Sequence, residues 1–441
     1  MKKTTSHAKG LIFFAVCMFL LSSRAVHGQT DEPINAGLQF NFSSPGARSL
    51  GVGGAFLGLA DDATAAFTNP AGLVQLSKPE VSAEGRRSSY TNQFTKGGTG
   101  NVSSVQALQT GTSKDDVTNL SFTSFVYPRR RWAIAAYRQE LANFATTLAS
   151  KAAFYVAPLG ARLAPAEASL ALRIVNVGVA GAVRVNDSLS IGAGLSDYQF
   201  NLHALNTRFQ TGDDPGVGAI FDFESQAGHD HELAVNAGLL WKISPQWSAG
   251  GVFRQGPRFN FSTLTKQADV TIPSFTLHGT FHVPDVYGAG VSFRPADAWT
   301  LTADYDRVRY SQLAGHTVDT QNPPGLANPA VNQLVVDDAN EVHLGIEYVM
   351  TRLKYPVAIR LGGWLDPDHR IRFQGTPPTP PIPTTSDLLT QQLFLDFRPG
   401  SDQVHVAGGI GLVISERFQL DAAYDHSRFV SIASLSGVWR F

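Results

Sequence analysis

The chain has 441 residues and a formal net charge of −1, with 35 basic against 36 acidic side chains. This balance leaves no basic excess for binding nucleic acid. Only 16% of the residues are charged, whereas Gly (41) and Phe (28) are abundant. Beyond the N-terminus no apolar segment reaches the length of a transmembrane helix, so an exported chain of strands is favoured.

The N-terminus has the layout of a secretory signal peptide. Lysines precede the apolar run 11–21, which is shorter than the about 20 residues that cross a bilayer. Small residues at 26–28 offer a cleavage site, so residues 1–28 are expected to be removed. Cys17 lies inside the apolar run rather than at its end, which argues against lipidation. The mature chain then has no cysteine for a disulfide or a thiolate metal site.

A segment with clear helix signals follows at residues 61–73, DDATAAFTNPAGL. Aspartates begin it, good helix formers fill it, and Asn69-Pro70 ends it. We therefore expect one short capped helix. Because no convincing strand precedes about residue 80, residues 29–78 are interpreted as a separate segment ahead of the strands.

Alternation of apolar and polar residues begins at about residue 80. In residues 342–348, for example, Val, Leu, Ile and Tyr share one face, while His, Gly and Glu share the other. This pattern predicts about fourteen strands, but it does not by itself separate a sandwich from a barrel. The expected strands are 80–90, 118–127, 131–142, 172–185, 189–204, 232–243, 246–262, 282–294, 298–311, 340–350, 356–366, 403–414, 417–427 and 430–441.

The lengths of the connections favour a barrel. Short connections alternate with mostly long ones rich in Gly, Pro and Asp, such as 206–231 and 312–339, except at the last hairpin. An even-stranded outer-membrane barrel needs this order, because its tight turns lie on the periplasmic side and its long loops outside. The short connections are 127–130, 185–188, 243–246, 294–297, 351–355 and 415–417.

Aromatic residues support the same fold. Five of the six tryptophans fall at the predicted periplasmic edge, as in an aromatic girdle: Trp132, Trp241, Trp247, Trp299 and Trp439. The C-terminus, residues 437–441, resembles the signal by which bacterial barrels are recognised for assembly. We therefore predict an all-β protein, a 14-stranded antiparallel transmembrane barrel at 79–441, inserted into the outer membrane by the barrel assembly machinery.

Two motifs resemble one known family. Residues 61–73, with the Gly-rich stretch 46–56 before them, resemble the N-terminal hatch of FadL-type outer-membrane transporters. Asn69-Pro70-Ala71 corresponds to that family's Asn-Pro-Ala motif. Residues 283–305 are similar to the family's hairpin in the middle of the barrel. The resemblance covers essentially the whole mature chain.

The resemblance implies a monomeric barrel whose lumen is plugged by the hatch at 29–78. Outer loops would capture hydrophobic molecules, an apolar pocket would hold them, and movement of the hatch would release them sideways into the membrane. Outer-membrane lipid and lipopolysaccharide would surround the barrel. A hatch residue such as Asn69 has an ordinary alternative interpretation as a helix stop.

Apolar side chains are the first candidates for substrate binding, because each buried CH₂ of a fatty acid or aromatic hydrocarbon gains about 0.8 kcal/mol. The alternative is that these aromatics pack loop on loop. The candidates are Phe144, Phe154 and Tyr155 in a long loop, and Phe259 and Phe261 at a strand end.

Alternation also places charged residues in the lumen, where Arg254 or Arg360 could meet a substrate carboxylate. The alternative is an ion-paired interior, in which Glu347 and Arg360 pair across adjacent strands. The other charged or titratable residues placed there are His343, Asp304, Asp306 and Asp421.

Other chemistry has little support. His229, Asp230, His231 and Glu232 suggest a metal site only superficially and are expected at a solvated loop–strand junction. Paired aspartates elsewhere lack the ligand spacing of a calcium loop. No nucleotide-binding or hydrolase motif is present in the sequence. We predict no catalytic residue, no metal and no cofactor.

Transport of hydrophobic small molecules is therefore the leading hypothesis. The alternative is a PorV-type barrel, a FadL relative that holds secreted proteins at the cell surface, and an enzyme ranks third. The sequence does not separate long-chain fatty acids from aromatic hydrocarbons as substrates.

Overall fold

The computed structural model describes residues 42, 44–96, 101–102, 109–151, 153–155, 162–163, 165–209, 216–267, 274–313, 334–376, 394 and 397–441. The expected signal peptide, 1–28, lies outside them. Among these residues, no helix is long and apolar enough to cross a membrane.

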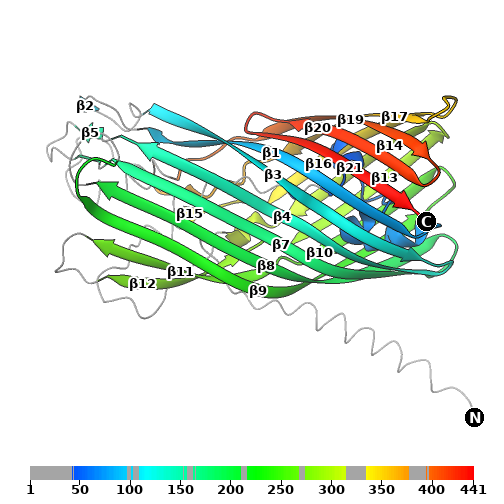
Figure 1. The fold of residues 1–441 in the computed structure, drawn as a ribbon, viewed down its shortest axis with the longest axis horizontal. Coiled ribbons are helices and arrows are strands. Elements are labelled where there is room, and N and C mark those ends of the chain that lie inside the picture. The colour runs from blue at the N-terminus through cyan, green and yellow to red at the C-terminus, as the bar shows by residue number, and fades with distance from the viewer. Residues whose placement is uncertain are drawn as a thin grey trace, which may run out of the picture.

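The chain forms a closed antiparallel barrel, as predicted (Figure 1). The sheet has 16 strand segments, and β10 closes it by pairing with β9. Two barrel strands are each interrupted once, so the 16 segments make 14 barrel strands. The segments are β1 (Glu80–Lys96), β3 (Gln109–Pro128), β4 (Trp132–Ser150), β7 (Ala166–Arg184), β8 (Leu189–Phe209), β9 (Ile220–Lys242), β10 (Trp247–Arg254), β11 (Arg258–Gln267), β12 (Phe275–His282), β13 (Val286–Ala296), β14 (Trp299–Val308), β16 (Ala339–Met350), β17 (Val357–Asp366), β19 (Gln403–Ser415), β20 (Phe418–His426) and β21 (Val430–Arg440).

The remaining described strands are short and belong to the long connections of the barrel. β2 (Asn101–Val102), β5 (Ala153–Tyr155) and β6 (Arg162–Leu163) form one small sheet, and β15 (Leu334–Val335) pairs with β18 (Arg372–Phe373).

The interruptions correct two predicted strands. The expected strand 246–262 is broken at 255–257 between β10 and β11, and the expected strand 282–294 begins earlier, as β12, and is broken at 283–285. Pro257 and Pro284 lack the N–H that a ladder needs. A Cβ on Gly256 would lie 1.7 Å from the carbonyl oxygen of Val283, so the two breaks fit against each other.

Several strands run farther toward the long connections than alternation indicates. β9 covers residues 220–242 against an expected 232–243, because beyond the membrane both faces of a strand become polar and the period-two signal fades. His229 to Glu232 therefore lie within β9, not at a loop–strand junction. His229 contacts Asn201 (2.8 Å) and His231 lies 3.4 Å from Asp197, both in exposed positions.

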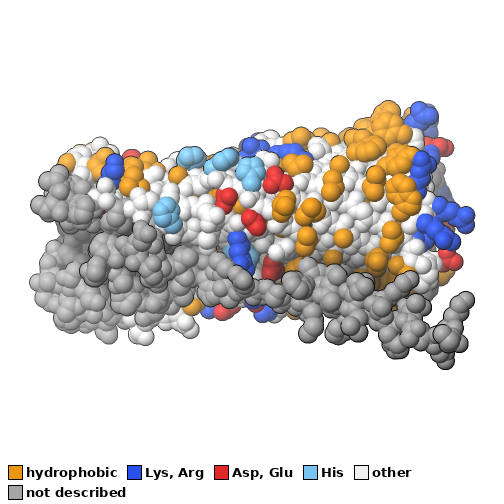
Figure 2. All heavy atoms as spheres, turned by 90° about the horizontal axis from the view of Figure 1, so that it is seen from below, with side chains coloured by type: hydrophobic (Ala, Val, Ile, Leu, Met, Phe, Trp, Pro, Cys, Tyr) orange, Lys and Arg blue, Asp and Glu red, His pale blue; other side chains and the backbone are white. Residues whose placement is uncertain are grey.

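On the face seen in Figure 2, hydrophobic side chains gather on the outside of the barrel near its tight turns, with Lys and Arg at the rim. Leu361, Val404 and Val406 are each at least 60% exposed on this outer face. The five tryptophans of the expected girdle are 40–49% exposed, whereas Trp364 faces inward and is 6% exposed. This outer face is the surface that lipid covers in an outer-membrane barrel.

The segment ahead of β1 lies inside the barrel (Figure 1). It contains α3 (Ala47–Gly51), α4 (Ala65–Thr68) and the 3₁₀ helix η1 (Pro70–Gln75). A helix therefore ends at Asn69-Pro70 as expected, but it is only four residues long, and η1 then begins within the segment 61–73. Asn69 is extended, ends α4 and caps η1 by accepting a hydrogen bond from Ala71 N (3.2 Å).

Burial raises the pKa of the Asp62 carboxyl, which lies in the same segment, above its usual range, although the guanidinium of Arg48 opposes this shift.

Candidate functional site

The luminal segment, residues 44–76, fits against the barrel wall through glycines. At several glycines of the barrel wall, the backbone of the luminal segment lies so close that any side chain at the glycine would collide with it. A Cβ on Gly250 would lie 2.1 Å from the carbonyl oxygen of Leu57, and one on Gly362 would lie 2.2 Å from Gly53 N. The wall glycines in such contact are Gly192, Gly250, Gly345 and Gly362, and a Cβ on Gly238 would collide with the side chain of Asn69.

Asn69 fastens this segment to the wall. Its side chain is fully buried, and Nδ2 donates to the carbonyl oxygens of Leu57 (2.9 Å) and of Leu239 in β9 (3.1 Å). Next to it, Pro70 and Ala71 pack over Gly192, where a Cβ would lie 2.5 Å from Ala71 N. All three residues of the expected hatch motif therefore lie at the contact between segment and wall.

Ion pairs hold the other side of the segment. Arg48 lies 2.6 Å from Asp61 and 3.0 Å from Glu347 in β16. Glu347 also accepts from Arg360 in β17 (2.6 Å), as expected, and Arg360 donates to Asp421 in β20 (2.7 Å). Arg360 is therefore already paired with two carboxylates of the wall and is not available to bind a substrate carboxylate.

An apolar cluster fills the lumen on the long-connection side of the hatch. It brings together three candidates, Phe144, Phe259 and Phe261, all less than 8% exposed. Phe200 stacks on Phe259 with ring centroids 4.7 Å apart. Tyr90 lies 4.9 Å from Phe144 by the same measure. These rings form the apolar wall that a hydrophobic substrate requires.

The positions of the candidate aromatics differ in part from those expected. Phe144 lies in β4, not in a loop, because β4 continues to Ser150. Phe154 and Tyr155 lie in β5, but their side chains are outside the described part of the structure. Phe200 and Phe281 were missed, although Tyr198, Phe200 and Leu202 alternate along β8 and could have been assigned to the lumen together.

Arg254 differs from the other luminal cations. It ends β10 at the base of the apolar cluster and is 7% exposed. Its guanidinium lies 5.4 Å from the centroid of the Phe67 ring in the hatch. Within the described residues, Nε and Nη1 of Arg254 have no hydrogen-bond partner. A buried cation with unsatisfied donors is costly to hold, and an anion at this position would satisfy those donors.

An apolar hollow of about 1040 Å³ lies elsewhere. Its lining includes Leu344, Leu361, Val404 and Val406, which are all more than half exposed on the outer face. It is part of the surface that lipid covers, so the apolar cluster in the lumen remains the better candidate for binding a transported molecule.

A closed barrel with an apolar outer face and a fitted luminal plug defines a class, the plugged outer-membrane β-barrel. Residues 30–351 match the family model described as outer membrane protein transport protein (OMPP1/FadL/TodX). The chain belongs to this family. As a member it is an outer-membrane transport protein for hydrophobic compounds and not an enzyme.

Solved structures share the fold. A Pseudomonas aeruginosa FadL homologue is 13% identical, with a TM-score of 0.62 over 92% of this chain and 100% of its own. The CymD monoaromatic hydrocarbon channel is 16% identical, with a TM-score of 0.57 over 91% and 99%. The Ralstonia pickettii toluene transporter TbuX is 14% identical, with a TM-score of 0.56 over 91% and 99%. No curated protein matches the sequence.

Neither the family description nor these structures concerns secretion or surface attachment, so the PorV-type alternative gains no support.

Proposed function

We propose that the chain carries amphipathic monocarboxylates with long apolar tails, such as long-chain fatty acids, across the outer membrane by passive diffusion. The observation that carries this proposal is Arg254, a buried cation with unsatisfied donors at the base of an apolar cluster. The cluster would hold the tail, and Arg254 would bind the carboxylate through charge-assisted hydrogen bonds. An aromatic hydrocarbon has no oxygen or nitrogen that would accept hydrogen bonds from the unsatisfied donors of Arg254.

The barrel wall beside the cluster supports sideways release. β3 and β4, both described in full, pair only between residues 122–128 and 133–139. Beyond that point β3 pairs with β1, and β4 pairs with β7 across a bulge at Leu141. This unpaired stretch begins close to Phe144, so a bound molecule would have a short path from the cluster to the bilayer.

Side chains, rather than main-chain hydrogen bonds, close the unpaired stretch. Asn119 of β3 bonds to Glu140 of β4. Thr146 of β4 donates to Asp115 of β3 (2.6 Å). Such contacts can separate through rotamer changes without breaking a strand ladder, so we place lateral exit here.

Residues 29–78 would act as the hatch and 79–441 as the barrel. We propose that release of Asn69, Pro70 and Ala71 from the wall accompanies gating. Captured molecules would enter from the long-connection end, with the protein acting as a monomer surrounded by lipid and lipopolysaccharide.

The test is uptake of labelled oleate and labelled toluene by cells that lack their own transporter, with and without this gene. Faster uptake of oleate alone would support the proposal. Uptake of toluene alone would assign the protein to hydrocarbons and remove the role of Arg254. No uptake of either compound by cells with a correctly inserted barrel would overturn the transport of both.

A further inference from the structure

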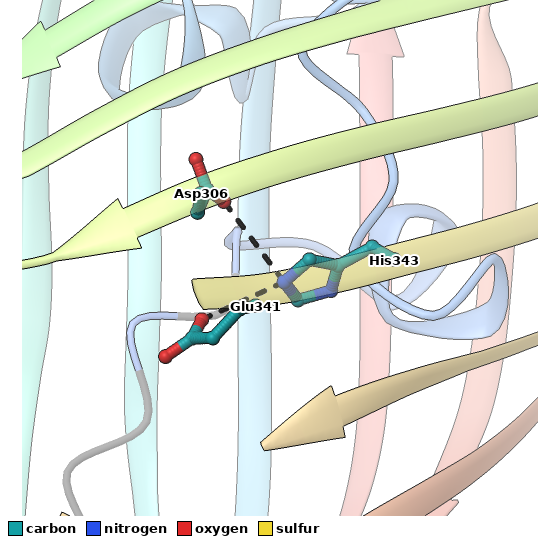
Figure 3. A group of neighbouring side chains, drawn as sticks. All are labelled: Asp306, Glu341 and His343. Atoms are coloured by element: carbon teal, nitrogen blue, oxygen red, sulfur yellow. Dashed lines mark ion pairs between the residues drawn. The ribbon is translucent and has the colours of Figure 1, made fainter. Parts of the chain in front are cut away.

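A second polar group lies in the lumen, away from Arg254 and the apolar cluster. It consists of Asp306 in β14 with Glu341 and His343 in β16 (Figure 3). Asp306 lies directly opposite Glu341 in the strand register, and His343 follows two residues later on the same face. One ligand atom from each residue lies within 4.8 Å of the other two. The two strands therefore fix the three donors in one place.

The orientation of His343 is that of a metal ligand. Its Nδ1 lies 2.7 Å from the carbonyl oxygen of Gly53 in the hatch, so Nδ1–H donates to that oxygen. In the neutral ring this leaves a lone pair on Nε2, which points at Glu341 Oε2 (3.6 Å) and Asp306 Oδ2 (3.9 Å). Metal-binding histidines characteristically donate their other ring N–H to a backbone carbonyl or carboxylate in this way.

No permanently charged side chain in the described part of the structure neutralises the two carboxylates of this group. The side chains of His343 and Glu341 are each 5% exposed and that of Asp306 is 13% exposed. Among the described residues, no Lys or Arg pairs with either carboxylate, and neither His343 Nε2 nor Asp306 Oδ1 has a hydrogen-bond partner. Two carboxylates held this close repel one another unless a positive charge lies between them, which is either a bound metal ion or a proton on Nε2 that makes His343 an imidazolium.

Neighbouring groups hold two of the three donors, Glu341 and His343, without neutralising the carboxylates. Tyr310 donates to Glu341 Oε1 (3.3 Å), and the ring of Trp364 stacks on that of His343, with centroids 5.0 Å apart. Asp304, the nearest further carboxylate along β14, accepts from Phe56 N (2.6 Å) and Leu57 N (2.7 Å) of the hatch. The group is thus joined to the hatch. Two further histidines lie nearby, and both pair with Asp366: His369 stacks on Tyr310, and His405 stacks on Trp364.

We propose that Asp306, Glu341 and His343 bind a divalent transition-metal cation such as Zn²⁺ or Mn²⁺. Two carboxylate oxygens and one imidazole nitrogen are a donor set that such ions accept, and three protein ligands leave a position for water. Because His343 also holds Gly53, the bound ion fastens the hatch to β14 and β16. The site does not depend on the identity of the transported molecule.

The test uses the full chain without a histidine tag, in detergent, stripped with a chelator and then dialysed against ZnCl₂ or MnCl₂. Mass spectrometry of the metal content should give one ion per folded chain, and the ion should raise the temperature at which the barrel unfolds. Glu341→Gln and Asp306→Asn should weaken binding by at least about tenfold. Asp222→Asn, which alters a buried carboxylate paired with Arg208 outside the group, should bind as the wild type does.

Failure of the folded wild type to retain or saturably bind either ion would overturn the proposal and leave His343 as an imidazolium paired with two carboxylates. Binding that is equal in the wild type and Glu341→Gln would also overturn it. If Asp306→Asn does not fold, the wild-type stoichiometry and the isosteric Glu341→Gln variant decide the question.

Discussion

The side-chain amide of Asn69 donates to the main-chain carbonyl of Leu239, so a hatch residue is hydrogen-bonded to the backbone of barrel strand β9. Gly238 and Gly250 make this contact possible, because a Cβ on either would lie less than 3 Å from an Asn69 side-chain atom. The link between hatch and wall is therefore specific and removable by single substitutions.

Asn69→Ala is expected to loosen the hatch. It removes two donated hydrogen bonds and the one that Asn69 Oδ1 accepts from Ala71 N, and it leaves the buried carbonyls of Leu57 and Leu239 without that donor, a loss of about 1–3 kcal/mol. Single-channel conductance and sensitivity of cells to a large antibiotic should both rise. The matched control is Gln75→Ala, which also removes two donated hydrogen bonds, but only to Leu59 and Ala60 within the hatch. Equal conductance in both variants would contradict a wall-anchoring role.

Two adjacent glycines of β10 test the fit of the hatch. In Gly250→Ala the new methyl group would lie 2.1 Å from Leu57 O, so the hatch must shift, with a destabilisation of about 1–3 kcal/mol. In Gly251→Ala the nearest atom, Gly288 O, would be 3.9 Å away, and the change should be smaller. Chemical unfolding of the two purified variants measures the difference. Equal destabilisation by Gly251→Ala and Gly250→Ala would contradict the close contact between the hatch and Gly250.

Arg360→Met should be among the most destabilising single changes in the wall. It leaves Glu347 and Asp421 as buried carboxylates without this partner, which typically destabilises by about 3–5 kcal/mol. Arg87→Met breaks an exposed pair with Asp116 and should change stability by less than about 1 kcal/mol. Unfolding midpoints of the two variants should therefore differ clearly. Similar midpoints would show that the network contributes no more than a surface pair.

How many strands the sequence could predict depends on the physical cause of the alternation between apolar and polar residues. Alternation identifies strands within the membrane because one face meets lipid and the other the lumen, and it places His343, Glu347 and Arg360 correctly. It weakens in the outer half of β9, where polar residues occupy both faces. β12, FTLHGTFH, does alternate, but the expected strand included only its last residue, His282. Alternation also cannot predict the breaks beside Pro257 and Pro284, which depend on contact between the two strands.

The candidate site was predictable only in part, for a similar reason. The aromatic and cationic residue types are visible in the sequence, but the unsatisfied donors of Arg254 are not, because a missing partner is a property of the tertiary structure. Arg360 has the same charge as Arg254 and the same expected orientation toward the lumen, but it forms ion pairs with Asp421 and Glu347. The wall glycines appear in the sequence as ordinary strand residues until the hatch lies against them.

Cross-linking tests lateral exit. The double variant Asp115→Cys with Thr146→Cys places two thiols across the unpaired stretch of β3 and β4, and the predicted mature chain has no other cysteine. Oxidation should block uptake of oleate, and a reductant should restore it. The control, Phe125→Cys with Ala136→Cys, joins the same strands where they are already paired and should leave uptake unchanged. Unimpaired uptake in the oxidised test variant would exclude exit at this position.

The most direct test of the central claim is to compare binding of oleate and methyl oleate to the purified protein, because the ester keeps the tail but lacks the negative charge. If Arg254 binds the carboxylate, oleate should bind more tightly by about 1.5–3 kcal/mol, or roughly tenfold to a hundredfold. Arg254→Gln should abolish this preference, and Arg208→Gln, which alters an arginine already paired with Asp222, should preserve it. Equal affinity of the wild type for both ligands, or an unchanged preference in Arg254→Gln, would contradict the account.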